Sequence, residues 1–204
     1  MDLYREGGKR FLDVLMSSIA LLVLLPVFIA VALIVKIAGV KGPVFFTQVR
    51  IGRDRQPFKL YKFRSMVQDA SSLGSGVTSS RDKRITGIGR ILRKTKLDEL
   101  PQLLNVLLGD MSIVGPRPEI ETFIDKYPDD YTVILQVKQG LTDYATLKYR
   151  NEEEILSQYE DAEEAYVRLI LPDKISLGKK YIEEMGFILD MKIIIKSVVE
   201  VIRV

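Results

Sequence analysis

The most apolar part of the chain is an uncharged run of 22 residues, at positions 14–35. As a helix, this run would be about 33 Å long, which is close to the thickness of the hydrocarbon core of a bilayer. Pro26 lies inside the run, where it removes one backbone hydrogen bond and clashes with the preceding turn. The pattern therefore predicts a membrane helix with a kink at Pro26.

Positively charged residues flank this run on both sides. Lys9 and Arg10 precede it, and Lys36 and Lys41 follow it, so the preference of cations for one side of a membrane sets no orientation. A bent, re-entrant helix that returns to the face it entered from agrees with both the kink and the charges. A straight signal anchor is the alternative. A cleaved signal peptide would be shorter and would carry a cleavage site of small residues.

After the membrane run the pattern changes to short β-type segments. Residues 44–46 are apolar, residues 58–63 mix apolar and polar positions, and a turn at 52–57 divides them. We expect a strand pair, or a strand that enters a helix. Residues 69–81 are rich in Ser and Gly and predict a loop, either a lid over a site or a plain connection.

A second helix is indicated by leucines that recur three and four residues apart. They are Leu100, Leu103, Leu104, Leu107 and Leu108. This spacing places one apolar stripe on a helix that packs against a core. Pro101 is tolerated only in a first turn, where its missing N–H would have no partner inside the helix. The helix is therefore predicted to begin near Asp98.

Asp98 and Glu99 are adjacent carboxylates at the predicted start of this helix. The positive end of the helix dipole favours their ionised form, and the free N–H groups there can also hold a phosphate. We expect both groups to be ionised. The structural alternative is that Asp98 is an N-cap and Glu99 a first-turn residue that the dipole favours.

The last segment, residues 188–204, is apolar apart from a few charged positions. These are Asp190, Lys192, Lys196, Glu200 and Arg203. Steps of four, four and three from Lys192 place a narrow charged stripe on an otherwise apolar helix. The segment is too polar to cross a membrane, so we expect it to lie in the membrane interface, with a core helix as the alternative.

Together these patterns predict an α+β fold that is mostly helical. It consists of an N-terminal kinked re-entrant membrane helix at residues 1–41 and a small catalytic domain with short strands and interfacial amphipathic helices at 42–204. The length of 204 residues and the hydrophobic content of 47% are sufficient for one core of ordinary size.

Composition removes several kinds of chemistry. The chain has no Cys, which excludes disulfides, thiol catalysis and cysteine-ligated metals, and no His, which excludes imidazole catalysis and histidine-ligated metals. An enzyme built from the remaining residues depends on carboxylates, Lys, Arg, Tyr or hydroxyls, and a metal would be a hard ion such as Mg²⁺. The net charge of +3 is too small to indicate a nucleic-acid partner.

Arg117 lies between two prolines, Pro116 and Pro118. Both prolines restrict the backbone, so a rigid loop presents one guanidinium, and little conformational freedom is lost when an anion binds. An ordinary proline-rich turn is the alternative.

Six cations at residues 50–64 form a further basic run, which a membrane surface with anionic headgroups would also attract.

Three ordered blocks carry a resemblance to a known family. They are residues 62–66 (KFRSM), residues 98–102 (DELPQ) and residues 115–118 (GPRP). With these blocks, from about Lys9 to the C-terminus, the chain resembles the monotopic phosphoglycosyl transferases among the bacterial sugar transferases. The resemblance implies that nearly the whole chain is the minimal catalytic unit of that family.

The resemblance also implies an activity. Asp98 would attack a UDP-sugar donor, release UMP and hold the phosphosugar until polyprenyl (undecaprenyl) phosphate accepts it. Glu99 would hold Mg²⁺. Five cations are the implied phosphate contacts: Lys59, Lys62, Arg64, Arg93 and Arg117. The implied location is the cytoplasmic face of the bacterial inner membrane, with membrane lipids as partners, and a homodimer is an open alternative.

Gln139 and Asp143 depart from the Pro-Gly-Leu-Thr-Gly sequence that is common in this family at positions 139–143. This difference leaves the sugar specificity open, and neither the sugar nor the downstream glycan follows from the residues. Arg150 is a further candidate for the site. Two other functions compete with the transferase, namely a catalytically inert membrane-anchored scaffold and a hydrolase that passes the phosphosugar to water.

Overall fold

The computed structural model describes residues 4–38, 42–70, 72–74 and 76–203. Four features of the sequence interpretation lie outside the described residues: the domain boundary at residue 41 with its cation Lys41, Ser71 and Ser75 of the predicted loop, and the terminal Val204.

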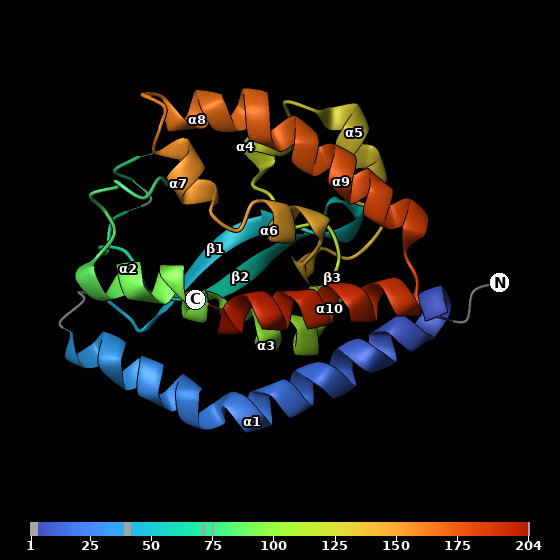
Figure 1. Ribbon diagram of the computed structural model, residues 1–204, viewed down its shortest axis with the longest axis horizontal. Coiled ribbons are helices and arrows are strands. Elements are labelled where there is room, and N and C mark those ends of the chain that lie inside the picture. The colour runs from blue at the N-terminus through green and yellow to red at the C-terminus, as the bar shows by residue number, and fades with distance from the viewer. Residues whose placement is uncertain (1–3, 39–41, 71, 75, 204) are drawn as a thin grey trace.

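The predicted apolar helix is present as α1 (Lys9–Ile37), which follows a π-helical turn at Tyr4–Gly8. Only 11% of its most apolar 18-residue window is buried inside the protein, so α1 is no ordinary core helix, and it is long and apolar enough to cross a membrane. Pro26 lies inside the helix, and the ribbon of α1 changes direction near its middle (Figure 1). The helix runs along the lower edge of the molecule in this view.

The predicted strand pair is confirmed as an antiparallel hairpin of β1 (Phe45–Ile51) and β2 (Pro57–Phe63), joined through a 3-10 turn at Arg53–Arg55. Its register pairs Phe45 with Phe63 and Ile51 with Pro57. Residues 69–81 contain no helix or strand among their described positions, as predicted for a loop.

The centre of the fold is a short run of elements after this loop. It comprises α2 (Gly87–Lys94), a 3-10 turn η3 (Leu97–Glu99), α3 (Gln102–Leu108) and β3 (Ser112–Val114), which pairs in parallel with β4 (Gly140–Thr142).

The α-helix begins at Gln102, so the prediction that it begins near Asp98 is wrong by four residues. The backbone bonds before it span three residues, as from Leu100 N–H to the Leu97 carbonyl (3.3 Å), and Pro101 has no N–H to donate. Asp98 and Glu99 therefore lie in a 3-10 turn that leads into the helix.

Most of the remaining helices form an upper layer over the hairpin (Figure 1). They are α4 (Glu121–Ile124), α5 (Pro128–Ile134), α6 (Tyr144–Lys148), α7 (Glu152–Leu156), α8 (Ala162–Ala165), a π-helical turn η4 (Tyr166–Ile170) and α9 (Leu171–Glu184). The last helix, α10 (Phe187–Ile202), lies below this layer, next to α1 (Figure 1). The largest hydrophobic core lies in the upper layer, around buried residues such as Ile124, Leu156 and Leu171. The mostly helical α+β architecture is confirmed.

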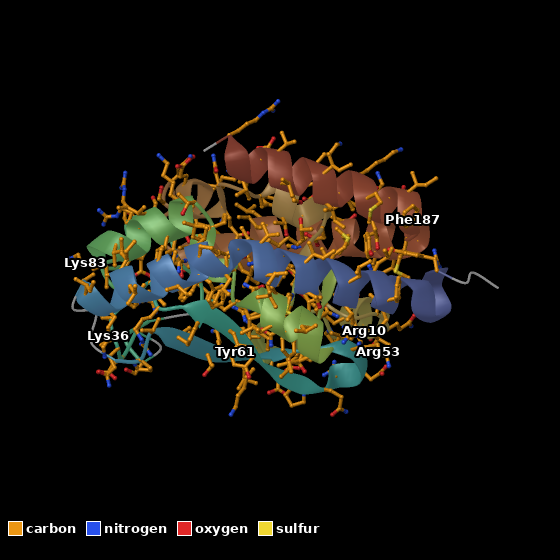
Figure 2. The ribbon with its side chains drawn as sticks, turned by 90° about the horizontal axis from the view of Figure 1, so that it is seen from below. Arg10, Lys36, Arg53, Tyr61, Lys83 and Phe187 are labelled. Atoms are coloured by element: carbon orange, nitrogen blue, oxygen red, sulfur yellow. The ribbon has the colours of Figure 1, made fainter. Side chains whose placement is uncertain are left out.

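Both halves of α1 pack against the rest of the chain. In the second half, Val31 and Val35 are buried with Phe63 of β2 and Leu92 of α2. Seen from below, α1 crosses the molecule between α10 on one side and α3 with the hairpin on the other (Figure 2).

The first half of α1 is held by polar contacts. Asp13 is buried, and its Oδ1 accepts hydrogen bonds from Ile113 N–H (2.9 Å) and the Ser112 hydroxyl (3.1 Å) of β3. Arg10 donates to the carbonyls of Val106 (2.6 Å) and Leu107 (2.9 Å) in the last turn of α3, where carbonyl groups run short of intrahelical N–H partners. These contacts fix α1 to the strand that leads to Arg117.

The predicted C-terminal amphipathic helix is confirmed as α10. A buried carboxylate, Asp190, anchors its first turn: Oδ2 accepts from Lys9 (2.5 Å) and Tyr4, and Oδ1 accepts from the Tyr181 hydroxyl (2.9 Å). We call these four residues the Asp190 cluster. It joins the start of α1 to α9 and α10.

Candidate active site

The turn that carries the acidic pair is shaped by the residues on either side of it. Lys96, which precedes the turn, adopts a left-handed conformation (φ 59°). Pro101 lies directly before the first residue of α3. No side chain caps η3 or α3. The interpretation of Asp98 as a simple N-cap is therefore wrong.

Asp98 is almost completely buried, with 3% of its surface exposed, and its Oδ1 has no hydrogen-bond partner among the residues that the structure describes. Burial raises the pKa of Asp98, and the neighbouring charge of Glu99 raises it further, while Lys62 and Arg93 act in the opposite direction. Desolvation therefore outweighs the nearby positive charges at Asp98, whereas the prediction that both acids are ionised stays a prediction.

Glu99 has the opposite electrostatic character. Its Oε1 accepts from Arg117 and from Lys62 (3.3 Å). Burial alone would raise the pKa of Glu99, but Arg117 and Lys62 together hold it well below its usual value. Burial in turn lowers the pKa of Lys62, and the charge of Glu99 opposes that change. Two adjacent carboxyl groups are thus driven apart in proton affinity by their surroundings.

Arg117 extends from a loop that the strand pair β3–β4 holds in place. Gly115 lies so close to β4 that an added Cβ would be 2.5 Å from the Lys138 carbonyl oxygen, so a larger residue would displace the loop. Besides its ion pair with Glu99, Arg117 donates to the Leu141 carbonyl (3.1 Å). Burial opposes its charge, but Glu99 outweighs this and raises the pKa of Arg117. The guanidinium is therefore fixed and always charged.

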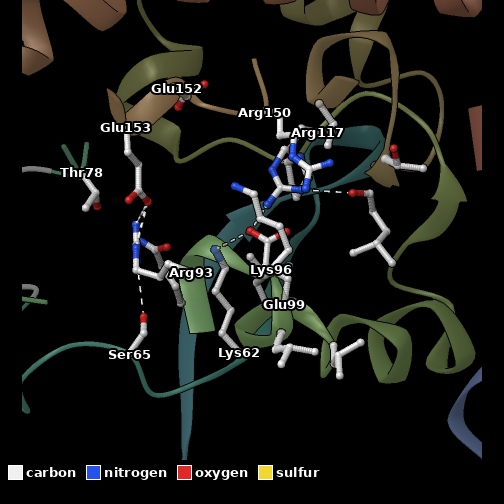
Figure 3. A pocket seen from close by; sticks show the side chains of 18 of the residues that line it. Lys62, Ser65, Thr78, Arg93, Lys96, Glu99, Arg117, Arg150, Glu152 and Glu153 are labelled. Atoms are coloured by element: carbon white, nitrogen blue, oxygen red, sulfur yellow. Dashed lines mark hydrogen bonds and ion pairs between the residues drawn. The ribbon is translucent and has the colours of Figure 1, made fainter. Parts of the chain in front are cut away.

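Arg93 reaches the site from α2. It forms an ion pair with Glu153 (Nε to Oε1, 2.8 Å) and donates to the Ser65 hydroxyl (3.4 Å), as the dashed lines in Figure 3 show. Burial opposes its charge, but Glu153 raises the pKa of Arg93 overall.

These side chains line a cavity of about 940 Å³ that reaches from α1 to the upper layer. Of the residues named from the sequence, it is lined by Lys62, Arg64, Arg93, Glu99, Arg117 and Arg150. Asp98 is not a lining residue, but Leu97 and Glu99 on either side of it are. The buried carboxylate therefore lies directly behind the cavity wall.

The structure separates Lys59 from this group. Alternation along β2 places Lys59 on the face opposite Lys62, where it is exposed and does not line the cavity. Arg64 lines the cavity, but its Nε donates to the Pro43 carbonyl (2.7 Å) and its guanidinium lies 5.8 Å from the centre of the Phe46 ring. It holds the segment after the membrane helix in place.

Sequence reasoning missed several residues of the site. Lys96 lines the cavity, and Glu153 holds Arg93 from a position 60 residues away in sequence. Gln102 is fully buried, and neither its side-chain nitrogen nor its oxygen has a partner. No local signal in the sequence marks Glu153, which lies in a run of three glutamates typical of the first turn of any helix.

The two residues that depart from the family pattern lie outside the cavity wall. Gln139 is buried and donates to the Val137 carbonyl (3.0 Å). Asp143 caps α6 by accepting from Thr146 N–H (2.7 Å), and burial raises its pKa. Neither lines the cavity among the residues the structure describes, and Asp143 influences the site through its charge, which helps to raise the pKa of Arg117.

Few side chains of the site could bind a metal ion. Within the described ranges, no group of three or more acidic side chains could hold an ion by itself. Mg²⁺, however, is usually bound by one or two carboxylates together with substrate phosphates and water. Of the two acids, Glu99 lines the cavity and Asp98 does not, so the Glu99 carboxylate fits such a shared site.

Comparison with known proteins identifies the family. The model of the family described as bacterial sugar transferase matches residues 4–204, and the chain belongs to this family. The resemblance found in the sequence is thus confirmed at the level of the family.

Individual relatives carry more specific names. The chain is 34% identical over 193 residues to a UDP-N-acetylgalactosamine-undecaprenyl-phosphate N-acetylgalactosaminephosphotransferase of Aeromonas hydrophila, covering 93% of this chain and 42% of the relative. It is 36% identical over 195 residues to a UDP-glucose:undecaprenyl-phosphate glucose-1-phosphate transferase of Escherichia coli (93% and 39%). A putative undecaprenyl-phosphate N-acetylgalactosaminyl 1-phosphate transferase of Bacillus subtilis is 46% identical over 122 residues (60% and 68%). The chain therefore spans about two fifths of the length of the first two relatives.

Proposed function

We propose that this protein transfers a sugar 1-phosphate from a UDP-sugar to a polyprenyl phosphate such as undecaprenyl phosphate, and releases UMP. Family membership and the names of its relatives support this activity. Those relatives name different sugars, so the proposal extends to the class of UDP-sugars.

The observation that carries the proposal is the contrast within the acidic pair. Asp98 is buried, has an unpartnered oxygen and a raised pKa, whereas Glu99 is paired with two cations and has a lowered pKa. A carboxylate without partners is a poorly solvated and therefore reactive nucleophile, and neighbouring cations can stabilise charge that develops on phosphate oxygens.

In the first step, an Asp98 carboxylate oxygen attacks the β-phosphorus of the donor. A bond forms between this oxygen and phosphorus, and the phosphoanhydride bond to the α-phosphate breaks. UMP leaves with the electron pair, and the phosphosugar stays on Asp98 as a mixed anhydride. Glu99 is paired with both Lys62 and Arg117. These two cations must therefore exchange their contacts with Glu99 for contacts with the diphosphate oxygens.

In the second step, an oxygen of the polyprenyl phosphate attacks the same phosphorus. The new bond is the diphosphate linkage of a polyprenyl diphosphate sugar, and the bond to Asp98 breaks, which regenerates the free carboxylate. Arg93 and Arg117 offset the charge on the phosphates in both steps. Their ion pairs with Glu153 and Glu99 hold the guanidinium groups in place before substrate binds.

Mg²⁺ is the proposed cofactor. Glu99 would hold it together with the donor diphosphate, and the ion would offset negative charge on the phosphate oxygens. Family resemblance and the donor set support this assignment, since the chain contains no His or Cys.

We further propose that α1 enters and leaves the same face of the membrane, which would place the cavity at the cytoplasmic face of the bacterial inner membrane. Three observations support a re-entrant helix: Pro26 lies inside α1, the ribbon bends near its middle (Figure 1), and cations flank both ends at Lys9, Arg10 and Lys36. An acceptor with an insoluble chain must be met at such an interface.

The test combines a covalent and a kinetic measurement. The protein is incubated with UDP-N-acetylgalactosamine, UDP-glucose or UDP-galactose and Mg²⁺, and its intact mass is measured before polyprenyl phosphate is added. With the correct donor we expect a mass increase of one phosphosugar and the release of one equivalent of UMP before acceptor is added. Addition of the acceptor should then remove the adduct and allow UMP release to continue. Asp98→Asn should show neither adduct nor UMP, and should still sediment with lipid vesicles.

Other outcomes would favour the competing functions. An inert scaffold releases no UMP with any donor, whereas a hydrolase releases UMP and free sugar phosphate without a lipid acceptor. An adduct that persists in Asp98→Asn would contradict the assignment of Asp98 as the nucleophile.

A further inference from the structure

One end of the cavity is apolar, and it adjoins the membrane helix. On α1 it is lined by Met16, Ala20 and Leu24, which are spaced four residues apart and so lie on one face of the helix. The other exposed apolar residues of α1, such as Leu22 (74% exposed) and Val23 (68%), do not line it. This face of α1 is therefore turned toward the site.

The opposite wall of this end comes from α10. Ile194, Val198 and Val201 line it at positions i, i+4 and i+7 of one helical face. Val198 and Val201 are exposed to 52% and 45%, an unusual position for large apolar side chains unless another apolar group covers them. Figure 2 shows α10 running beside α1, and Figure 1 shows it above α1. We call the space between these six residues the tail channel.

The tail channel is continuous with the charged part of the site. The same cavity is lined by Lys62, Glu99 and Arg117. Two polar residues of α10 also line the cavity, and both have partners: the Ser197 hydroxyl is hydrogen-bonded to the Thr142 hydroxyl (2.6 Å), and Glu200 accepts from Arg150 (3.1 Å). An occupant of the channel would therefore find apolar contacts along its length and cations at its inner end.

We infer that the tail channel binds the first isoprene units of the acceptor and directs its phosphate toward Arg117 and Lys62. The inference rests on the proposed function and adds to it the place where the lipid is held. A nucleotide or sugar would leave its many polar groups without partners between these walls. A long hydrocarbon chain with one terminal phosphate matches both the apolar walls and the cationic end, and α1 joins the channel to the membrane.

The experiment uses two matched pairs of substitutions in the full chain. Leu24→Trp and Val198→Trp fill the tail channel, whereas Leu22→Trp and Val199→Trp place the same side chain on the same helices outside the cavity. Transfer is measured in detergent micelles with undecaprenyl phosphate and with dimethylallyl phosphate, which has a single isoprene unit. The ratio of the two values of kcat/KM is compared with that of the parent protein.

We expect Leu24→Trp and Val198→Trp to lower the ratio of long-chain to short-chain transfer about tenfold or more, because a short chain buries little surface in the channel. The two control variants should keep the ratio of the parent. An unchanged ratio in the channel variants would overturn the inference, and so would an equal loss with both acceptors, which would indicate a general distortion of the site. If the parent protein transfers to neither acceptor, the proposed function fails as well.

Discussion

The Asp190 cluster and the Asp98–Glu99 pair each contain a buried aspartate, but the two aspartates differ in how their carboxylate oxygens are hydrogen-bonded. At Asp190 both carboxylate oxygens are hydrogen-bonded, to Tyr4 and Lys9 on one side and Tyr181 on the other. At Asp98 one oxygen is buried with no partner, although cations lie nearby. The first cluster joins three helices, and the second lies behind the wall of a large cavity.

The difference separates a structural contact from a candidate site. A buried carboxylate that is fully hydrogen-bonded stabilises the arrangement around it, whereas an unpartnered one costs free energy that folding alone does not recover. Local destabilisation of this kind is typical of functional groups that await a substrate. On this comparison, Asp98 has the surroundings expected of a catalytic group, and Asp190 those expected of a structural group.

The largest expected effect is on Asp98. Asp98→Asn should lower the rate of UMP release by at least about 10³-fold, because the amide cannot act as the nucleophile. Its free energy of unfolding should not fall below that of the parent. The raised pKa means that the folded state favours the protonated carboxyl, so the advantage of the neutral amide should increase as pH rises through that pKa.

Denaturant unfolding at several pH values, beside the UMP assay, measures both quantities. A marked loss of stability in Asp98→Asn at neutral pH would mean that Asp98 is a structural carboxylate like Asp190. The proposed difference between the two aspartates would then be wrong.

A smaller loss is expected at Arg117. Arg117→Ala should lower kcat/KM by about 10²- to 10³-fold, as for the loss of one preorganised donor to a developing charge. The same substitution removes the main cation that holds the pKa of Glu99 low, so that pKa should rise. The acid limb of the pH–rate profile should consequently move to higher pH.

Arg53→Ala is the matched control, because Arg53 is exposed at the tip of the hairpin and paired only with the exposed Asp54. It should leave both the rate and the profile unchanged. If Arg117→Ala moved the acid limb to lower pH, the assigned ion pair with Glu99 would be wrong.

The smallest of the three effects concerns stability alone. Asp190→Asn should lower the free energy of unfolding by about 1–3 kcal/mol, since the amide cannot accept from all three donors and leaves Lys9 without its counter-charge. The cost is limited because the Lys9 side chain is 15% exposed and can turn toward water.

Asp125→Asn provides the comparison for this change, as Asp125 is 62% exposed and its ion pair with Arg55 is long (3.9 Å). It should change the free energy of unfolding by no more than about 0.5 kcal/mol. Equal effects of the two substitutions would show that the Asp190 cluster does not anchor α10.

Much of the fold could be predicted because it depends on patterns within short segments. The apolar run gave α1, the alternation beyond it gave the hairpin, and the charged stripe gave α10. The start of α3 was predicted wrongly, because Pro101 is compatible with both a first α-helical turn and the end of a 3-10 turn. The left-handed Lys96, which decides between them, has no marker in the sequence.

The amino-acid sequence by itself determined which chemistry is present: two adjacent acids, a rigid arginine loop, no Cys or His, and an apolar helix of membrane length. These properties follow from residue type and local spacing. Only the tertiary structure decided that Asp98 and Glu99 differ, that Lys59 lies apart from Lys62, and that Glu153 holds Arg93. Burial and long-range ion pairs set these differences, and both depend on segments that are distant in the chain.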